Sequence, residues 1–365
     1  MRSPFRFIQR NNQQIFKQIM KIAIHHRPGS YSDRWIEYCE ENNIPYKIVN
    51  AYDTDIIQQV KDCDAFMWHH YHYDPIDALF AKQLLFSLEQ AGKIVFPNFK
   101  TGWHYDDKLG QKYLFEACGI KSAHAYVFYD KKVAYNWIAH TDFPKVFKLR
   151  KGFGSRNVML AHNKKEAKKF VRKAFGKGFP QFDGMRYFKD RFENYKSGKI
   201  TLLNLIRSSF RIIIPPKYSR IMNKEIGYVY FQDFIPNEGF DYRIELTGEK
   251  AIALKRYVRP NDFRASGSHN NIYDNQLIEK DVIRFAFNIA EKLEMQTVAL
   301  DIVRNKKTSE LYLIEICYCY GLDEDEFDHG YWTKNGEWHD EKFDSRDWMV
   351  DAVIEEYNKK TNSMF

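Results

Sequence analysis

The chain has 365 residues, 44% of them hydrophobic and 28% charged, and its formal net charge is +8 at pH 7. This length and composition are enough for substantial hydrophobic cores in two or three compact units. The five scattered cysteines include no C-x-x-C pair, and no apolar run approaches the roughly 20 residues that span a bilayer, so zinc-ribbon, disulfide-framework and membrane-spanning classes are excluded and a cytoplasmic location is favoured.

Residues 1–20 form a basic, polar leader before the first predicted strand, with Arg2, Arg6, Arg10 and Lys17 as its cations. It has no apolar core of the signal-peptide kind. Because its apolar residues are few and spread out, we expect a dispensable arm, a surface helix or the product of an early start codon rather than a membrane anchor.

Residues 21–121 are predicted to form the first compact unit. Short strands at 22–24, 46–49, 65–68 and 94–96 alternate with helices at 33–42 and 75–92, and a further helix covers 107–117. This alternation predicts a small, parallel, doubly wound sheet. Ligands approach such sheets at the carboxyl ends of the strands, where the histidine-rich runs 25–27 and 69–72 lie. We expect these histidines to form a substrate-binding surface, with a metal site as the weaker alternative.

The second predicted unit covers residues 122–230 and contains a lysine followed by a glycine loop. A strand ending at Lys148 leads to Gly152 and Gly154, which lack a Cβ, so backbone N–H groups of this loop can surround phosphates. The same pattern also occurs in surface turns. The interpretation as a nucleotide phosphate site therefore depends on the carboxylates found later in the chain.

Positive charge is concentrated in this unit. Between Arg150 and Glu225 there are 20 Lys and Arg against 5 Asp and Glu, and the stretch 184–224 is long enough to be an insertion. Its basicity fits an acidic glycan, a lipid-linked sugar phosphate or the anionic inner face of a membrane as a peripheral contact. Specific nucleic-acid binding is disfavoured because the aromatic residues form no recognisable single-strand-binding module.

The third predicted unit, residues 231–365, has the α+β pattern of an antiparallel sheet. Strands are expected at 241–246, 251–258, 298–303 and 311–316, with a hairpin turn at 247–249 and a helix at 279–293. Asp301 and Glu315 interrupt apolar strands, where an unpaired carboxylate is costly to bury. Two such carboxylates on neighbouring strands suit Mg²⁺, or Mn²⁺ as an alternative, while two ion pairs at strand ends are the simpler interpretation.

The order of these motifs resembles the ATP-grasp superfamily, and more closely its RimK-like branch of carboxylate–amine ligases, over residues 22–348. Four runs also resemble a group often found with bacterial surface-polysaccharide genes, namely 34–37, 101–108, 143–148 and 330–332. The resemblance implies an α/β chain, α+β in its C-terminal half, with a Rossmann-like pre-ATP-grasp domain at 21–121. It further implies a lid subdomain at 122–230 and a C-terminal ATP-grasp subdomain at 231–365.

The resemblance also implies a nucleotide site. Lys108 and Lys148 would contact the ATP phosphates, and a loop that includes Gly152, Gly154 and Ser155 would cover them. Adenine would meet the backbone of Gln232, Asp233, Phe234 and Ile235, and Glu238 would reach the ribose.

Catalytic and metal-binding roles follow from the same resemblance. Arg264 matches the arginine that faces the transferred phosphate, with Arg243 and Lys255 as further catalytic cations, and Asp301 and Glu315 match two metal ligands. The family's third ligand is usually an asparagine, and here that position is Cys317. A neutral thiol is a poor ligand for Mg²⁺, so one or two metals remain open.

The implied reaction is ATP-dependent joining of a small-molecule carboxylate to an amine through an acyl-phosphate, which needs positioning and charge neutralisation rather than a nucleophilic side chain. A sugar or uronic acid of a surface polysaccharide is the implied carboxylate, and a homodimer is a further expectation. Two alternatives stay open: a catalytically weak nucleotide-binding regulator, towards which Cys317 points, and a carbohydrate-binding or glycan-modifying protein.

Overall fold

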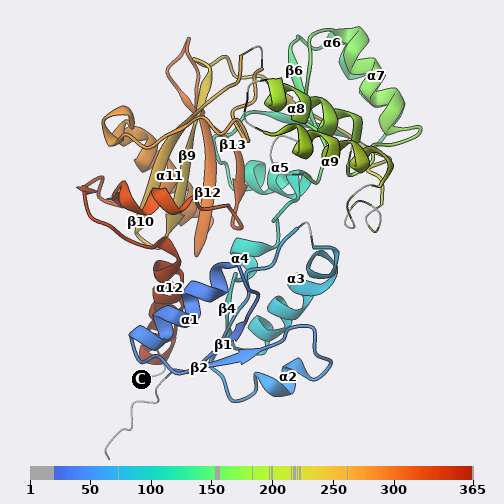
Figure 1. The fold of residues 1–365 in the computed structure, drawn as a ribbon. Coiled ribbons are helices and arrows are strands. Elements are labelled where there is room, and N and C mark those ends of the chain that lie inside the picture. Colours follow the sequence, from blue (N-terminus) through green and yellow to red (C-terminus); the bar gives the residue numbers. More distant parts are fainter. Residues whose placement is uncertain are drawn as a thin grey trace, which may run out of the picture.

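The computed structural model describes residues 20–363, apart from positions 73, 153–156, 183, 197, 199, 215, 217, 218, 220, 222 and 261. Three sheets organise the chain: a parallel sheet, a small antiparallel sheet and a large antiparallel sheet. In Figure 1 the parallel sheet lies below the large one, and the small sheet with its helices lies at the upper right. No helix in the described part of the chain has the length and apolar character needed to cross a bilayer.

The first sheet is parallel and has helices on both faces, as predicted. Its strand order is β2 (Tyr46–Val49), β1 (Ile22–His25), β3 (Ala65–Met67) and β4 (Ile94–Phe96). Because successive side chains of a strand point to opposite faces, Ile22 and Ile24 join one core while Ala23 joins the other. The first core includes α1 (Tyr31–Glu41), and the second includes α2 (Ile56–Gln59) and α3 (Pro75–Gln90).

The last helix of the chain, α12 (Ser345–Asn362), completes the first core. Met349, Val350 and Val353 are buried against Ile22 and the other residues of that cluster. The Nε atom of Arg34 on α1 lies 2.6 Å from Oδ1 of Asp347 on α12. In Figure 1 the two helices lie side by side on the first sheet, so the C-terminal end of the chain is built into its N-terminal unit.

The small sheet has the order β5 (Ala125–Phe128), β8 (Val229–Asp233), β6 (Lys145–Lys148) and β7 (Met159–Ala161), with antiparallel neighbours. Phe147 and Phe231 pack against α6 (Lys131–His140) and α7 (Lys164–Ala174). The alternate residues of the same strands, including Lys148, therefore point to the opposite face.

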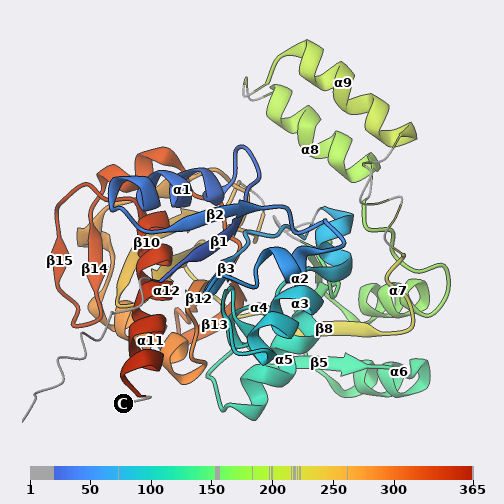
Figure 2. The ribbon, with the colours of Figure 1, turned by 90° about the horizontal axis from the view of Figure 1, so that it is seen from below.

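A two-helix arm leaves this unit between α7 and β8. It consists of α8 (Gly184–Lys196) and α9 (Leu202–Ile213), which pack against each other and project from the body in Figure 2. Reciprocal backbone hydrogen bonds between Phe179 and Glu225, both 2.9 Å, close the base of the arm. A Cβ on Gly184 would lie 2.8 Å from the Cα of Ile212, so glycine permits this close helix contact.

The large sheet is antiparallel, as predicted. Its order is β13 (Leu311–Cys317), β12 (Thr297–Arg304), β9 (Phe240–Thr247), β10 (Lys250–Tyr257), β14 (Tyr331–Thr333) and β15 (Trp338–His339), with β11 (Asn271–Ile272) beside β10. Gly248, at φ +58°, lies in the predicted hairpin turn between β9 and β10. The helix α11 (Lys280–Lys292) covers one face with an apolar core, and the 3-10 turns are η1 (Asn275–Leu277) and η2 (Glu324–Asp328).

The outer side of β13 pairs with groups that are not strands. The side chain of Gln111, on α5 (Lys108–Ala117), donates from Nε2 to the carbonyl oxygen of Ile316 at 2.8 Å and accepts from its N–H at 3.3 Å. Below it, the N–H of Ala123 donates to Leu313 O at 2.9 Å, and the N–H of Leu313 donates to Lys121 O at 3.0 Å. The short helix α4 (Phe99–Gly102) precedes α5.

Candidate active site

A row of charged side chains crosses the face of the large sheet that α11 leaves uncovered. Arg243 on β9 is paired in register with Asp301 on β12, which is paired with Glu315 on β13. One step along, Asp241 on β9 is paired with Arg256 on β10. Directly opposed residues of neighbouring strands share a face, so these side chains from four strands converge.

Asp301 is held as an anion by two arginines. Its Oδ1 atom accepts from Nη1 of Arg243 at 2.8 Å and lies 2.9 Å from Nη2 of Arg256. Burial opposes the charged carboxylate, but Arg256 and Arg243 outweigh it and lower the pKa of Asp301 to about 2. Each arginine has a second carboxylate, Glu245 at 3.0 Å for Arg243 and Asp241 at 2.8 Å for Arg256. The two arginines therefore orient Asp301 rather than standing ready for an anionic ligand.

Lys108 connects α5 to both the glycine loop and the large sheet. Its Nζ donates to the carbonyl oxygen of Gly152 at 2.8 Å and lies 2.9 Å from Oε1 of Glu315. Burial works against the ammonium, but Glu315 and Asp106 raise the pKa of Lys108 above its usual value. Asp106 also accepts from the N–H of Gly152 at 2.8 Å, so this glycine is fixed from both sides.

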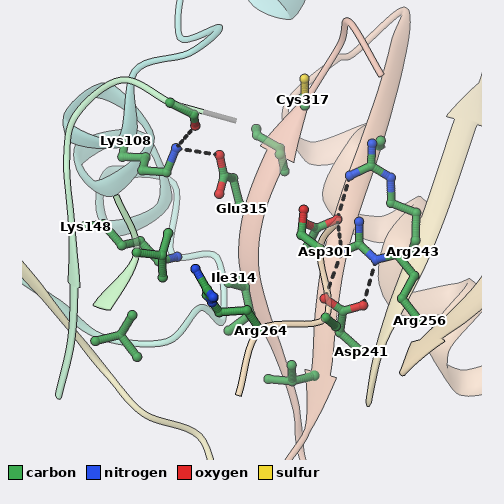
Figure 3. Close-up of a pocket in the computed structure, with 18 of the residues that line it drawn as sticks. Lys108, Lys148, Asp241, Arg243, Arg256, Arg264, Asp301, Ile314, Glu315 and Cys317 are labelled. Carbon is green, nitrogen blue, oxygen red and sulfur yellow. Dashed lines mark hydrogen bonds and ion pairs between the residues drawn. The ribbon is translucent and has the colours of Figure 1, made fainter. Parts of the chain in front are cut away.

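Lys148 has a different environment, although it faces the same space. It ends β6 and is buried, and among the residues that the structure describes it makes no ion pair within 4.0 Å. Burial lowers its pKa to about 8, with Glu315 opposing the effect and Lys108 adding to it. In Figure 3 Lys108 and Lys148 approach from one side, and Glu315 and Asp301 stand opposite.

These groups line one cavity of about 410 Å³, within the range of about 300–1,000 Å³ usual for small-molecule sites. The lid sheet and the linker after it contribute Val146, Lys148, Gln232, Asp233, Phe234 and Ile235. Arg264 comes from the loop after β10, and Asp262 holds its guanidinium with Nε at 2.8 Å from Oδ1 and Nη2 at 2.7 Å from Oδ2. Figure 3 shows this guanidinium directed towards Lys148. Nearly all the predicted site residues that are described therefore meet here.

One predicted catalytic residue, Lys255, does not line the cavity, whereas its neighbour Arg256 does. Ala251 and Ala253 belong to the core under α11, so the two-residue period of β10 turns Lys255 to that face as well. There its Nζ lies over the rings of Phe240 and Tyr242, 4.4 and 5.1 Å from their centres. Apolar residues on both faces of β10 hide this alternation in the sequence, and a catalytic role for Lys255 stays a prediction.

Other predicted residues are placed less directly. Glu238 is exposed beside the linker and is not among the residues that line the cavity, so its ribose contact stays a prediction. Gly154, Ser155 and Arg156 lie outside the described residues, as does the leader before residue 20. Gly152 does line the cavity.

Fewer histidines of the first unit reach the cavity than the predicted histidine-rich binding surface implied. His25, His69 and His70 are buried, and burial lowers the pKa of His69 to about 3. His72 does line the cavity, together with Tyr105. The described residues contain no group of three or more His, Cys, Asp and Glu arranged to hold a metal ion.

Two hard oxygen ligands nevertheless fit Mg²⁺. The arginine contacts of Asp301 all involve Oδ1, and the lysine contact of Glu315 involves Oε1, so each carboxylate has a second oxygen for an ion. Cys317 does not add a third ligand. Burial raises the pKa of its thiol well above the usual value, its Sγ donates to the carbonyl oxygen of Cys319 at 3.2 Å, and Figure 3 shows the sulfur pointing away from Asp301.

A parallel N-terminal sheet, a small antiparallel lid sheet and a large antiparallel sheet that meet around one cavity define the ATP-grasp fold, and this chain has that fold. The sequence matches no protein-family model and no curated protein. The fold comparisons with solved structures therefore confirm the expected resemblance at the level of the fold.

Three solved structures illustrate the likeness. A RiPP-associated ATP-grasp ligase from Chryseobacterium gregarium, in complex with ADP and a leader and core peptide, has a TM-score of 0.55 and 13% identity, over 92% of this chain and 97% of that one. The biotin carboxylase domain of 2-oxoglutarate carboxylase from Hydrogenobacter thermophilus has a TM-score of 0.53 and 13% identity, over 92% of this chain and 69% of that one. A RimK-domain ATP-grasp protein from Sphaerobacter thermophilus has a TM-score of 0.50 and 14% identity, over 83% of this chain and 92% of that one.

Proposed function

We propose that this chain is an ATP-dependent, ADP-forming ligase that joins a carboxylate to an amine. The observation that carries the proposal is the pair of buried lysines, Lys108 and Lys148, facing the carboxylates Asp301 and Glu315 across one cavity. Two cations opposite two hard-ion ligands suit the phosphates of a nucleotide bound with Mg²⁺. The structures of two proteins with the same fold contain ADP, and one of these also contains MgADP.

The nucleotide would lie between the lid sheet and the large sheet. Its phosphates would contact Lys108 and Lys148, and the adenine would lie against the linker 232–235. Asp301 and Glu315 would hold Mg²⁺, which when bound neutralises phosphate charge and polarises the transferred group. Lys148 needs no rearrangement of an ion pair to receive a phosphate, and a phosphate would return its ammonium to full charge.

The reaction would proceed in two steps. A carboxylate oxygen of the substrate attacks the γ-phosphorus of ATP, the bond to the β–γ bridging oxygen breaks, and ADP leaves. The amine then attacks the carbonyl carbon of the acyl-phosphate, phosphate leaves with the bonding electrons, and the nitrogen loses a proton to give the amide. Arg264, held by Asp262, would compensate the charge on the transferred phosphate.

The substrate proposal is narrower and rests on different support. We assign the carboxylate substrate to a sugar or uronic acid of a surface polysaccharide and the amine substrate to an amine or amino acid. The four sequence runs described above support this assignment. The five free cysteines support a cytoplasmic site of action. The basic stretch between Arg150 and Glu225 supports a place at the inner face of the membrane. The biotin carboxylase domain was solved as a dimer, and a homodimer belongs to this proposal as well.

The test is a screen for ADP release with Mg-ATP, uronic acids and a panel of amines and amino acids. The expected result is release that requires both the carboxylate and the amine and that disappears in Lys148→Ala. Tight Mg-ATP binding without amine-dependent release would instead favour the nucleotide-binding regulator that Cys317 suggests. A folded protein that binds glycans but not Mg-ATP would refute the ligase proposal.

A further inference from the structure

The helical arm formed by α8 and α9 has an apolar stripe that no other described part of the chain covers. On α9 the side chains of Leu203, Ile206, Phe210 and, just beyond its end, Ile214 are 69%, 48%, 60% and 57% exposed. Their spacing of three or four residues puts them on one face of the helix. The opposite face packs inward, where Leu205 and Ser208 are buried against α8.

The stripe is accompanied by positive charge. Residues 180–224 contain ten Lys and Arg against three Asp and Glu, and α9 itself has no acidic residue. Arg207 and Arg211 are exposed beside the stripe. An amphipathic helix with apolar residues on one face and cations alongside lies in the interface of an anionic membrane, with its apolar face among the lipid chains.

We propose that this arm docks the protein on an anionic phospholipid bilayer, with α9 lying in the plane of the surface. The apolar stripe enters the boundary of the acyl chains, and Arg207 and Arg211 contact the lipid phosphates. The arm is shaped for this contact because it projects from the body in Figure 2 and is joined to it at the Phe179–Glu225 pair.

Charge distinguishes this partner from the others that could cover the stripe. A second copy of the chain would bring an equally basic arm against the first, and like charges would repel. Single-stranded nucleic acid needs aromatic surfaces for base stacking, whereas this stripe is mostly aliphatic. An anionic bilayer supplies an apolar interior for the stripe and a negative surface for the cations beside it.

The experiment is co-sedimentation of the full chain with vesicles of phosphatidylcholine alone or with 30% phosphatidylserine. We expect binding to the anionic vesicles that weakens with salt and is lost, by about a hundredfold or more, in the triple variant L203E/I206E/F210E. The double variant R207Q/R211Q should weaken binding by about fivefold for each cation removed.

Matched controls separate docking from non-specific attraction. The variant I57E/I76E/L79E changes three apolar residues on α2 and α3 that are 50%, 45% and 73% exposed, so it alters charge equally but away from the arm. The variant K165Q/K168Q removes two exposed cations from α7. Both should bind anionic vesicles within about threefold of the unaltered protein, and circular dichroism of every variant should match it.

Three results would overturn the proposal. The unaltered chain could fail to bind anionic vesicles, or the α2–α3 or α7 controls could weaken binding as much as the arm variants. Alternatively, sedimentation could show a dimer that L203E/I206E/F210E converts to a monomer, which would assign the stripe to a second copy. None of these readouts depends on ligase activity, so failure of the docking proposal and failure of the ligase proposal are distinguishable.

Discussion

Replacing Lys148 by methionine should stabilise the protein without ligand while weakening its binding of ATP. Methionine fills a similar volume but needs no hydration, whereas the buried ammonium has a pKa of about 8 instead of the usual lysine value of 10.5. That difference of about 2.5 units corresponds to about 3 kcal/mol of the free energy of unfolding, at about 1.4 kcal/mol per unit. At pH 7 the variant should be more stable by up to this amount.

The pH dependence gives the sign of the effect. Below pH 8 the lysine is protonated in both the folded and unfolded states, so the folded protein carries the whole cost. Between pH 8 and the usual lysine pKa of 10.5 the unfolded chain holds more protons, so the free energy of unfolding of the unaltered protein rises with pH. The advantage of the variant should therefore shrink through this window and vanish above it.

Urea unfolding at pH 7 and pH 9.5 measures the stability, and calorimetric titration measures ATP affinity, which should fall at least about tenfold. The matched control is Lys145→Met on the same strand, where the removed lysine is paired with Asp233. That change leaves a carboxylate without its partner and should not stabilise the fold. A Lys148→Met protein that is less stable at pH 7, or whose advantage does not change with pH, would refute the reasoning.

Asp301→Asn and Glu315→Gln should each abolish ADP release and raise the Mg²⁺ requirement, and Asp301→Asn should also lower the free energy of unfolding by about 3 kcal/mol because two buried arginines lose their shared anion. Normal turnover of both variants at low Mg²⁺ would make these carboxylates structural. Cys317→Asn should lower the Mg²⁺ concentration for half-maximal rate, since an amide oxygen is a harder ligand than a thiol, and Cys317→Ala is its control. An unchanged Mg²⁺ titration would mean that position 317 supplies no metal ligand and that Asp301 and Glu315 are the two protein ligands. Lys255→Met should not change the rate of ADP release, whereas Arg256→Met should lower it at least about tenfold, because Arg256 contacts Asp301 and Lys255 lies on the other face of the sheet. Equal losses in the two variants would contradict the assignment of their strand faces.

Local patterns in the sequence were sufficient for most of the fold. The strands predicted at 46–49 and 94–96 have those bounds in the structure, and the helix predicted at 107–117 begins one residue later. The strand at 94–96 is a continuous buried apolar run, and the helix has a clear cap in Asp107, whose side chain accepts from the N–H of Gly110. The packing of α12 on the first sheet was not predictable, because it joins residues more than 300 positions apart, such as Arg34 and Asp347.

The candidate site was predictable where residue type alone carried the signal. Lys148 before glycines, and Asp301 within an apolar strand, are conspicuous in a linear sequence. Asp106 and Asp241 are not, because aspartate is common in turns and at strand ends, and only the structure shows that Asp106 fixes Gly152 and that Asp241 pairs with Arg256. Their roles depend on long-range neighbours, and a single sequence contains no record of those neighbours.

The pairing of Gln111 with β13 has a consequence for the behaviour of the protein in a crowded solution. An exposed outer strand is a template on which another chain can add, and β13 would be such a strand at the end of the large sheet. The amide of Gln111 and the segment 121–123 occupy its free hydrogen-bonding groups, so they block this route to aggregation. The same amide ties the helix that carries Lys108 to the strand that carries Glu315, so Gln111 contributes both to the resistance to edge-to-edge assembly and to the spacing of these two charges.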